Sequence, residues 1–98
     1  MFGMNKHMLF CVCKDFMVQN LFEFRPEVVE DTEKTLKLKI VRRKRVITVT
    51  LKLLSGKIQL DVDDTDYLIH IPTKTFKKDT EAQLHILNIK KAISDNLR

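Results

Sequence analysis

Two cysteines and a histidine near the N-terminus are the first residues in this chain that could do chemistry. His7, Cys11 and Cys13 form a His-x3-Cys-x-Cys pattern, which could supply part of a metal site. However, no fourth ligand stands at a spacing typical of zinc. A disulfide between cysteines one residue apart is geometrically unfavourable, so we expect reduced, largely buried thiols. Core packing is therefore favoured over metal binding.

The acidic segment DVDDTD (61–66) is the second candidate for chemistry. It has the carboxylates of a calcium loop but lacks the glycine and the downstream glutamate of an EF-hand. His70 and His85 are distant from His7 in sequence, and no Ser or Cys stands in a nucleophile turn. There is also no glycine-rich phosphate loop. The sequence therefore predicts a protein that is not an enzyme and that uses no cofactor or metal.

Composition and charge favour a folded, basic binding protein. The 98 residues carry a formal net charge of +5 and contain 44% apolar residues but only two Gly and two Pro. This predicts one domain over residues 1–98, with residues 1–5 either disordered or an apolar arm. A basic excess is typical of proteins with an anionic partner such as nucleic acid or a membrane surface.

Localisation signals are weak in this sequence. No apolar run approaches the roughly 18 residues of a membrane span. The apolar run MLFCV (8–12) is shorter than the roughly 7–15 residues of a signal-peptide core, and charged residues follow it at once. We expect a cytoplasmic protein.

The N-terminal quarter of the chain predicts a helix that ends before a proline. Apolar residues between positions 6 and 24 follow a helical spacing, and Pro26 disfavours helix at the residue before it. The first residues could instead form a strand or an apolar interface arm, for which the candidates are Phe2, Met4, Met8 and Phe10. The acidic, aperiodic stretch 27–34 is expected to be a loop.

From Thr35 the apolar period changes to two, which is typical of strands. The alternation predicts four strands, at about 36–41, 46–53, 57–62 and 67–71, with turns at Ser55-Gly56 and 63–66. A final helix follows, with Thr80 and Gln83 as a capping box. Its apolar stripe contains Ala82, Ile86, Ile89, Ile93 and Leu97, flanked by Leu84 and Leu87.

The expected fold is α+β, with a single antiparallel four-stranded sheet in the order α-β-β-β-β-α. Both helices pack on one face, and the other face is open. Lysines and hydroxyls on that face suit phosphate and sugar contacts. Tyr67 is expected on the core side. We therefore do not expect bases to stack on the open face. The candidate nucleic-acid contacts are Lys37, Lys39, Arg42, Arg43, Lys44, Arg45, Lys52 and Lys57. Solvated lysines that keep the sheet soluble are the alternative explanation.

Three segments resemble the small signal recognition particle subunit of 9 kDa and its fungal 21-kDa counterpart. They are NLFEFRP (20–26), ITVTLKLLSGKIQLDVDD (47–64) and TKTFKKDTEAQLHILNIKKAI (73–93). The resemblance implies an α-β-β-β-α fold and a heterodimer with a related subunit that binds the particle's Alu-domain RNA. Lys52 matches a basic strand residue of that RNA face. Asp61 stands where the family tends to carry a basic residue.

The order of helix, four strands and helix, with RRKR (42–45) between the first two strands, is also similar to the kinase-associated C-terminal domain. That resemblance implies contacts with a kinase domain or with acidic phospholipids, although the Gly-Asp-rich entry to the last helix is missing. An oligomeric structural subunit is a third option. The leading hypothesis is a basic RNA-binding subunit of a cytoplasmic ribonucleoprotein.

Overall fold

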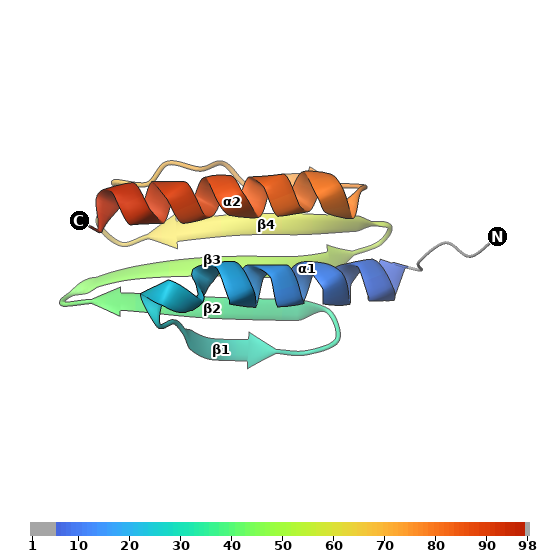
Figure 1. Ribbon diagram of the computed structural model, residues 1–98, viewed down its shortest axis with the longest axis horizontal. Coiled ribbons are helices and arrows are strands. Elements are labelled where there is room, and N and C mark those ends of the chain that lie inside the picture. The colour runs from blue at the N-terminus through green and yellow to red at the C-terminus, as the bar shows by residue number, and fades with distance from the viewer. Residues whose placement is uncertain (1–5, 98) are drawn as a thin grey trace.

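The computed structural model describes residues 6–97, apart from the side chain of Lys6, as two helices on one face of a five-stranded sheet (Figure 1). The elements in chain order are α1 (Lys6–Leu21), the 3-10 turn η1 (Phe22–Phe24), β1 (Glu27–Asp31), β2 (Thr35–Arg42), β3 (Arg45–Leu54), β4 (Lys57–Asp64), β5 (Lys74–Phe76) and α2 (Asp79–Asn96). The strands form an antiparallel meander in the order β1-β2-β3-β4-β5. The predicted α+β class is confirmed, but the four-strand count is wrong.

Strand β1 occupies the segment that we expected to be an acidic loop. Its five residues are all exposed, and its pairing with β2 is interrupted by a bulge between Val28 and Glu30. Glu27 pairs with Lys39 and Glu30 with Lys37, so opposite charges meet across the two strands. An exposed, bulged strand has no period-two pattern, which is why the alternation did not reveal it.

The predicted fourth strand at 67–71 is absent, and β5 lies further along the chain, after Pro72. Asp64 explains the difference. Its side chain accepts hydrogen bonds from the backbone N–H groups of Asp66, Leu68 and Ile69. Those donors are no longer available to a sheet ladder, so the chain runs as a loop from 65 to 73.

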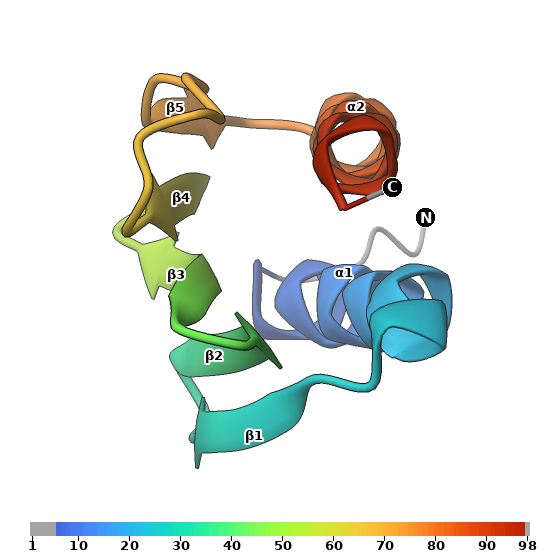
Figure 2. The same cartoon turned by 90° about the vertical axis from the view of Figure 1, so that its left-hand side faces the viewer.

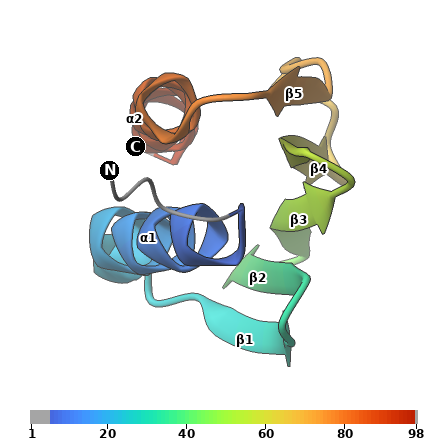
Figure 3. The ribbon, with the colours of Figure 1, turned by 90° about the vertical axis from the view of Figure 1, so that its right-hand side faces the viewer.

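The core lies between the concave face of the curved sheet and the two helices (Figures 2 and 3). Alternate residues of β2, β3 and β4 point into it, as the period-two pattern predicted, and every strand register is continuous there. Helix α1 contributes Phe10, Met17 and Leu21. Nearly all the hydrophobic stabilisation comes from this one layer.

Helix α2 matches the predicted stripe but not the predicted start. Its buried face contains Ala82, Ile86, Ile89 and Ile93, together with His85. Leu84 and Leu87, expected beside the stripe, are exposed. The helix begins at Asp79 after an N-cap at Lys78 that makes no side-chain capping bond, so the capping box at Thr80 is wrong. Acids in the first turn still favour this start through the helix dipole.

From residue 6 the N-terminal segment is a helix rather than a strand, and the disordered stretch or apolar arm expected over residues 1–5 lies outside the described residues. Phe10 is buried in the core and Met8 is half exposed. Residues Phe2 and Met4 of the suggested arm lie outside the described part of the chain. Cys13 is buried but Cys11 is exposed, because a helix points residues i and i+2 in different directions. Among residues 6–97, no helix is long and apolar enough to cross a membrane.

Candidate nucleic-acid interface

The open face of the sheet carries the predicted lysines, but acids stand beside them. Lys37 lies between Glu30 on β1 and Thr50 on β3, and Lys39 lies between Glu27 and Thr48. On the far side of those threonines, β4 contributes Asp61 and Asp63. Both of these rows across the sheet therefore read acid, lysine, threonine, acid. Because the charges alternate, this face is not a uniform attractor for a polyanion.

Lys52 and Lys57 lie at the end of the sheet that contains the Ser55-Gly56 turn. Both side chains are exposed. Lys52 stands between Thr35 and Gln59, with no acid directly opposite, and Lys57 pairs with Leu54. The eight predicted contacts are thus divided between the two ends of the sheet and the middle of its open face.

The basic turn, which we define as residues 42–45, closes the β2–β3 hairpin at the opposite end of the sheet. Arg43 and Lys44 are the two unpaired residues between the strands, and both are exposed, as is Arg42. Arg43 has φ of 58°, a left-handed conformation that hairpin turns usually assign to Gly, Asn or Asp. For an arginine this geometry costs about 1 kcal/mol. Backbone strain of this kind is more frequent at functional positions than elsewhere.

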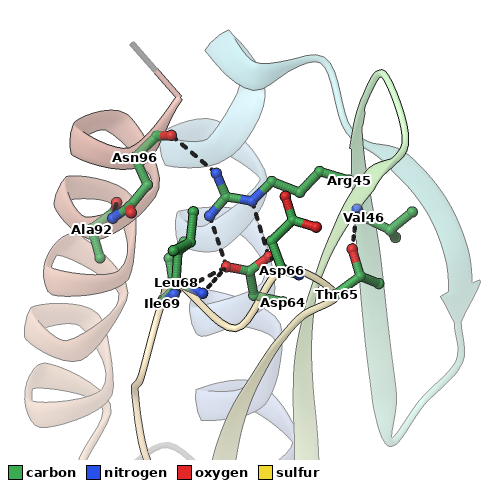
Figure 4. Close-up of polar contacts among 9 residues, drawn as sticks. All are labelled: Arg45, Val46, Asp64, Thr65, Asp66, Leu68, Ile69, Ala92 and Asn96. Atoms are coloured by element: carbon green, nitrogen blue, oxygen red, sulfur yellow. Dashed lines mark hydrogen bonds and ion pairs between the residues drawn. The ribbon is translucent and has the colours of Figure 1, made fainter.

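Arg42 and Arg45 lie on the helix side of the sheet rather than on its open face. Arg42 donates to the carbonyl oxygen of Phe24 at 2.6 Å, which ties β2 to η1. Arg45 donates to the two carboxylate oxygens of Asp64 at 2.9 and 2.7 Å and to the carbonyl oxygen of Asn96 at 3.0 Å (Figure 4). The Arg45 guanidinium therefore joins β3, β4 and the end of α2.

Asp64 is the buried acceptor at the centre of this network, with only 3% of its surface exposed. Besides Arg45, it accepts the three backbone N–H groups of the following loop, each at 3.0 Å. The hydrogen bonds from Arg45 and then from the backbone hold the pKa of this carboxyl well below its usual range, although burial opposes them. The loop after β4 is therefore fixed to the sheet by an ionised side chain.

Tyr67 projects from that loop into solvent, which corrects its expected place on the core side. It is 74% exposed and has φ of 56°, and the neighbouring Leu68 is 59% exposed. The loop leaves β4 beside the basic turn, since the Thr65 hydroxyl accepts the N–H of Val46 at 2.9 Å (Figure 4). Sequence alternation misplaced Tyr67, although the turn predicted at 63–66 already indicated that Asp and Thr side chains bind the nearby backbone.

A shallow groove of about 800 Å³ separates the basic turn from the end of α2. Its lining is Arg42, Arg43, Lys44, Arg45, Asp66, Asn96 and Leu97. Four of these seven residues are cationic and one is acidic. Arginine forks and a lysine ammonium are the donors that bind phosphate oxygens best. This end of the molecule is the part of the described surface where the predicted contacts do converge.

The candidate metal and catalytic residues do not converge. Among the described residues, no three His, Cys, Asp or Glu side chains lie close enough together to hold a metal ion. The Sγ atom of Cys11 is 3.9 Å from Nε2 of His7, while Cys13 is buried in the core. His85 is also buried, and burial followed by the charge of Lys74 lowers its pKa.

No known protein family, no curated protein and no solved structure matches this chain.

Proposed function

We propose that this chain is a non-catalytic RNA-binding protein that contacts the RNA backbone with the basic turn and the adjoining groove. One observation carries the proposal: Arg43 occupies a left-handed turn position, where glycine would be easier, at the lip of a groove lined by four cations. A solvated turn has no need of an arginine in that conformation. A phosphate-binding turn does, because the side chain then supplies planar, charge-assisted donors.

The residues of this surface have two different roles, contacting the RNA and holding the basic turn in place. Arg43 and Lys44 contact phosphates, because they are exposed and belong to the turn itself. Arg42 and Arg45 are largely occupied by protein acceptors, so they fix the turn relative to η1 and the β4 loop. Tyr67 offers an exposed ring on which an unpaired base can stack.

The lysines of the open face are secondary contacts in this proposal. Lys37 and Lys39 have acids opposite them on β1, which offset their charge locally. Lys52 and Lys57 lack an opposing acid but stand at the other end of the sheet. We therefore expect them to add long-range attraction rather than to fix the RNA.

The likeness to the small subunits of the signal recognition particle supports a ribonucleoprotein setting. In that setting the chain pairs with a related small subunit and acts in the cytoplasm. Two features depart from that family's three-stranded pattern: the acidic edge strand β1 and the short strand β5. Neither covers the basic turn.

A second candidate function is binding to acidic phospholipids, in line with the likeness to the kinase-associated domain. One observation favours it: the exposed pair Tyr67 and Leu68 lies at the same end of the sheet as the cations of the basic turn. An aromatic and an aliphatic side chain beside cations suit the interface of an anionic membrane.

Fluorescence anisotropy with labelled RNA, measured over a series of salt concentrations, tests the first function against the second. If about three phosphates are neutralised, the slope of log K against log salt is about −2 to −3. Vesicles containing phosphatidylserine are the second arm of the experiment. Binding to those vesicles without RNA binding at roughly 10 μM protein would favour the membrane function. A salt-insensitive RNA affinity contradicts the backbone contact.

A further inference from the structure

Strand β1 is an open edge of the sheet, and it begins three residues after Phe24, whose carbonyl oxygen accepts a hydrogen bond from Arg42 of the basic turn. It pairs with β2 on one side only, and its outer side faces away from the rest of the molecule (Figure 2). An open edge presents unpaired N–H and C=O groups that can accept another strand. Proteins usually cover such an edge or fill it with charge. Here Glu27 and Glu30 lie on the open face of the edge. The helix-side face combines an apolar groove with Asp31, which forms an ion pair with Lys14 of α1.

The apolar face of the edge is a groove between β1 and the end of α1. It has a volume of about 350 Å³ and is lined by Val18, Phe22, Arg25, Pro26, Val28 and Leu38. Phe22 is 73% exposed and Val28 is 60% exposed. Two large apolar side chains therefore stay in water beside an unpaired strand. Burying these side chains under an incoming strand would remove apolar surface from water.

The acidic face of the same edge is formed by Glu27 and Glu30. Both point to the open side of the sheet, because they pair with Lys39 and Lys37 of β2. Val28 points the other way, since it pairs with the core residue Leu38. Strand β2, which already pairs with β1, thus places lysines opposite Glu27 and Glu30 and an apolar side chain opposite Val28.

We propose that β1 binds an extended segment of a partner protein in which Lys or Arg alternates with apolar residues. The segment adds to the outer edge of β1 as a sixth strand. Its cations lie next to Glu27 and Glu30, and its apolar side chains enter the groove beside Phe22 and Val28. Main-chain hydrogen bonds supply affinity, and this alternation supplies specificity.

Charge argues for such a segment rather than for a second copy of β1. Two antiparallel copies of Glu27–Asp31 would bring acids of one chain against acids of the other. Like charges directly opposite each other on neighbouring strands are destabilising. A basic strand meets no such penalty.

The probe for this proposal is a labelled, end-capped peptide with the sequence TLKLKIV, which is residues 35–41 of this chain. Anisotropy of the peptide with the folded protein is expected to show saturable binding. Backbone amide shifts of the protein are expected to change at Glu27–Asp31. The double variant E27Q/E30Q and the single variant F22S are each expected to weaken binding about tenfold.

Matched controls distinguish peptide binding at the β1 edge from nonspecific binding elsewhere on the protein. Asp63→Asn removes an exposed acid from β4, and Leu84→Ser removes an exposed apolar side chain from α2; both are expected to bind the peptide like the wild type. A peptide of the same composition with its two lysines adjacent is expected to bind at least tenfold more weakly. Methylating the peptide amides on one edge only is expected to abolish binding, and methylating the other edge to preserve it.

Several outcomes overturn the proposal. They are no saturable binding at about 1 mM peptide, equal binding by E27Q/E30Q and D63N, or amide shifts centred on the basic turn. A stable dimer in sedimentation of the peptide-free protein, lost in F22S, would show that a second copy covers the edge instead. The result is independent of RNA binding, because Arg43→Glu is expected to leave peptide affinity unchanged.

Discussion

Arg45 and Asp64 form a buried, two-pronged ion pair that connects the basic turn to the loop carrying Tyr67. The Arg45 Nε and Nη2 atoms lie 2.9 and 2.7 Å from the two Asp64 oxygens, and the side chains are 10% and 0% exposed. The carboxylate also holds three loop N–H groups. The Asp64 side chain therefore determines where β4 ends and fixes the loop from which Tyr67 projects into solvent.

Asp64→Asn is expected to lower the free energy of unfolding by about 3–5 kcal/mol, because it leaves a buried guanidinium without its charge partner. Urea denaturation followed by circular dichroism measures the loss. The control Asp63→Asn, one residue earlier and exposed, is expected to change stability by less than about 0.5 kcal/mol. A loss below 1 kcal/mol for Asp64→Asn would mean that the pair is only a surface contact.

Acid is expected to weaken the fold in two steps, and His85 causes the first. Its pKa is lowered by burial and then by Lys74, so the folded state binds its proton less readily than the unfolded state does. Between the unfolded pKa of about 6.5 and the lower folded pKa, the unfolded state holds more protons. The contribution of uncharged His85 to the free energy of unfolding is therefore fully present above a pH of about 6.5. It is lost as the pH drops through this window.

Urea midpoints at a series of pH values check this step. His85→Leu is expected to flatten it, whereas His70→Gln, at an exposed position, is expected to retain it. The second step belongs to Asp64, whose folded pKa is lowered chiefly by Arg45. Its contribution is present above the unfolded pKa of about 4 and is lost as pH falls toward the folded value. An unchanged pH profile in His85→Leu would assign the first step to another group.

The two cysteines are expected to differ sharply in reactivity. Burial, and then the charge of Asp79, raises the pKa of the Cys13 thiol to about 11, so almost no thiolate exists at pH 8. Cys11 is exposed on the same helix. With a thiol reagent, one group reacts at once in the native protein and the second only after denaturant is added. Cys11→Ser removes the fast phase; rapid reaction of the remaining Cys13 thiol in that native variant would contradict its burial.

The regular part of the fold was predictable because burial on one face imposes a period of two. Leu36, Ile47 and Leu60 all face the core as their alternation required. Strand β1 was not predicted, because none of its residues is buried and its sequence therefore shows no alternation of apolar and polar residues. The segment 67–71 has the right alternation, but the N–H groups of its first three residues bind the side chain or the carbonyl oxygen of Asp64 and not a neighbouring strand.

The candidate site was only partly predictable for a related reason. Sequence reveals that residues 42–45 are basic, but not which of them are occupied by protein acceptors. Arg45 is fixed by a carboxylate nineteen residues later, and Arg42 by a carbonyl eighteen residues earlier. The acids opposite Lys37 and Lys39 come from a strand that the pattern did not reveal. Pairs between residues so distant in the sequence can be identified only once the fold is known.

The central claim is that Arg43 and Lys44 hold the RNA backbone. Its most direct test is the RNA affinity of R43E/K44E beside that of K52E/K57E, which makes the same charge change at the other end of the sheet. Urea midpoints of both variants report whether they remain folded. The claim predicts a loss of at least about tenfold for R43E/K44E, or about 1.4 kcal/mol, and less than about threefold for K52E/K57E. Equal losses in the two variants, or no loss in R43E/K44E, would contradict it.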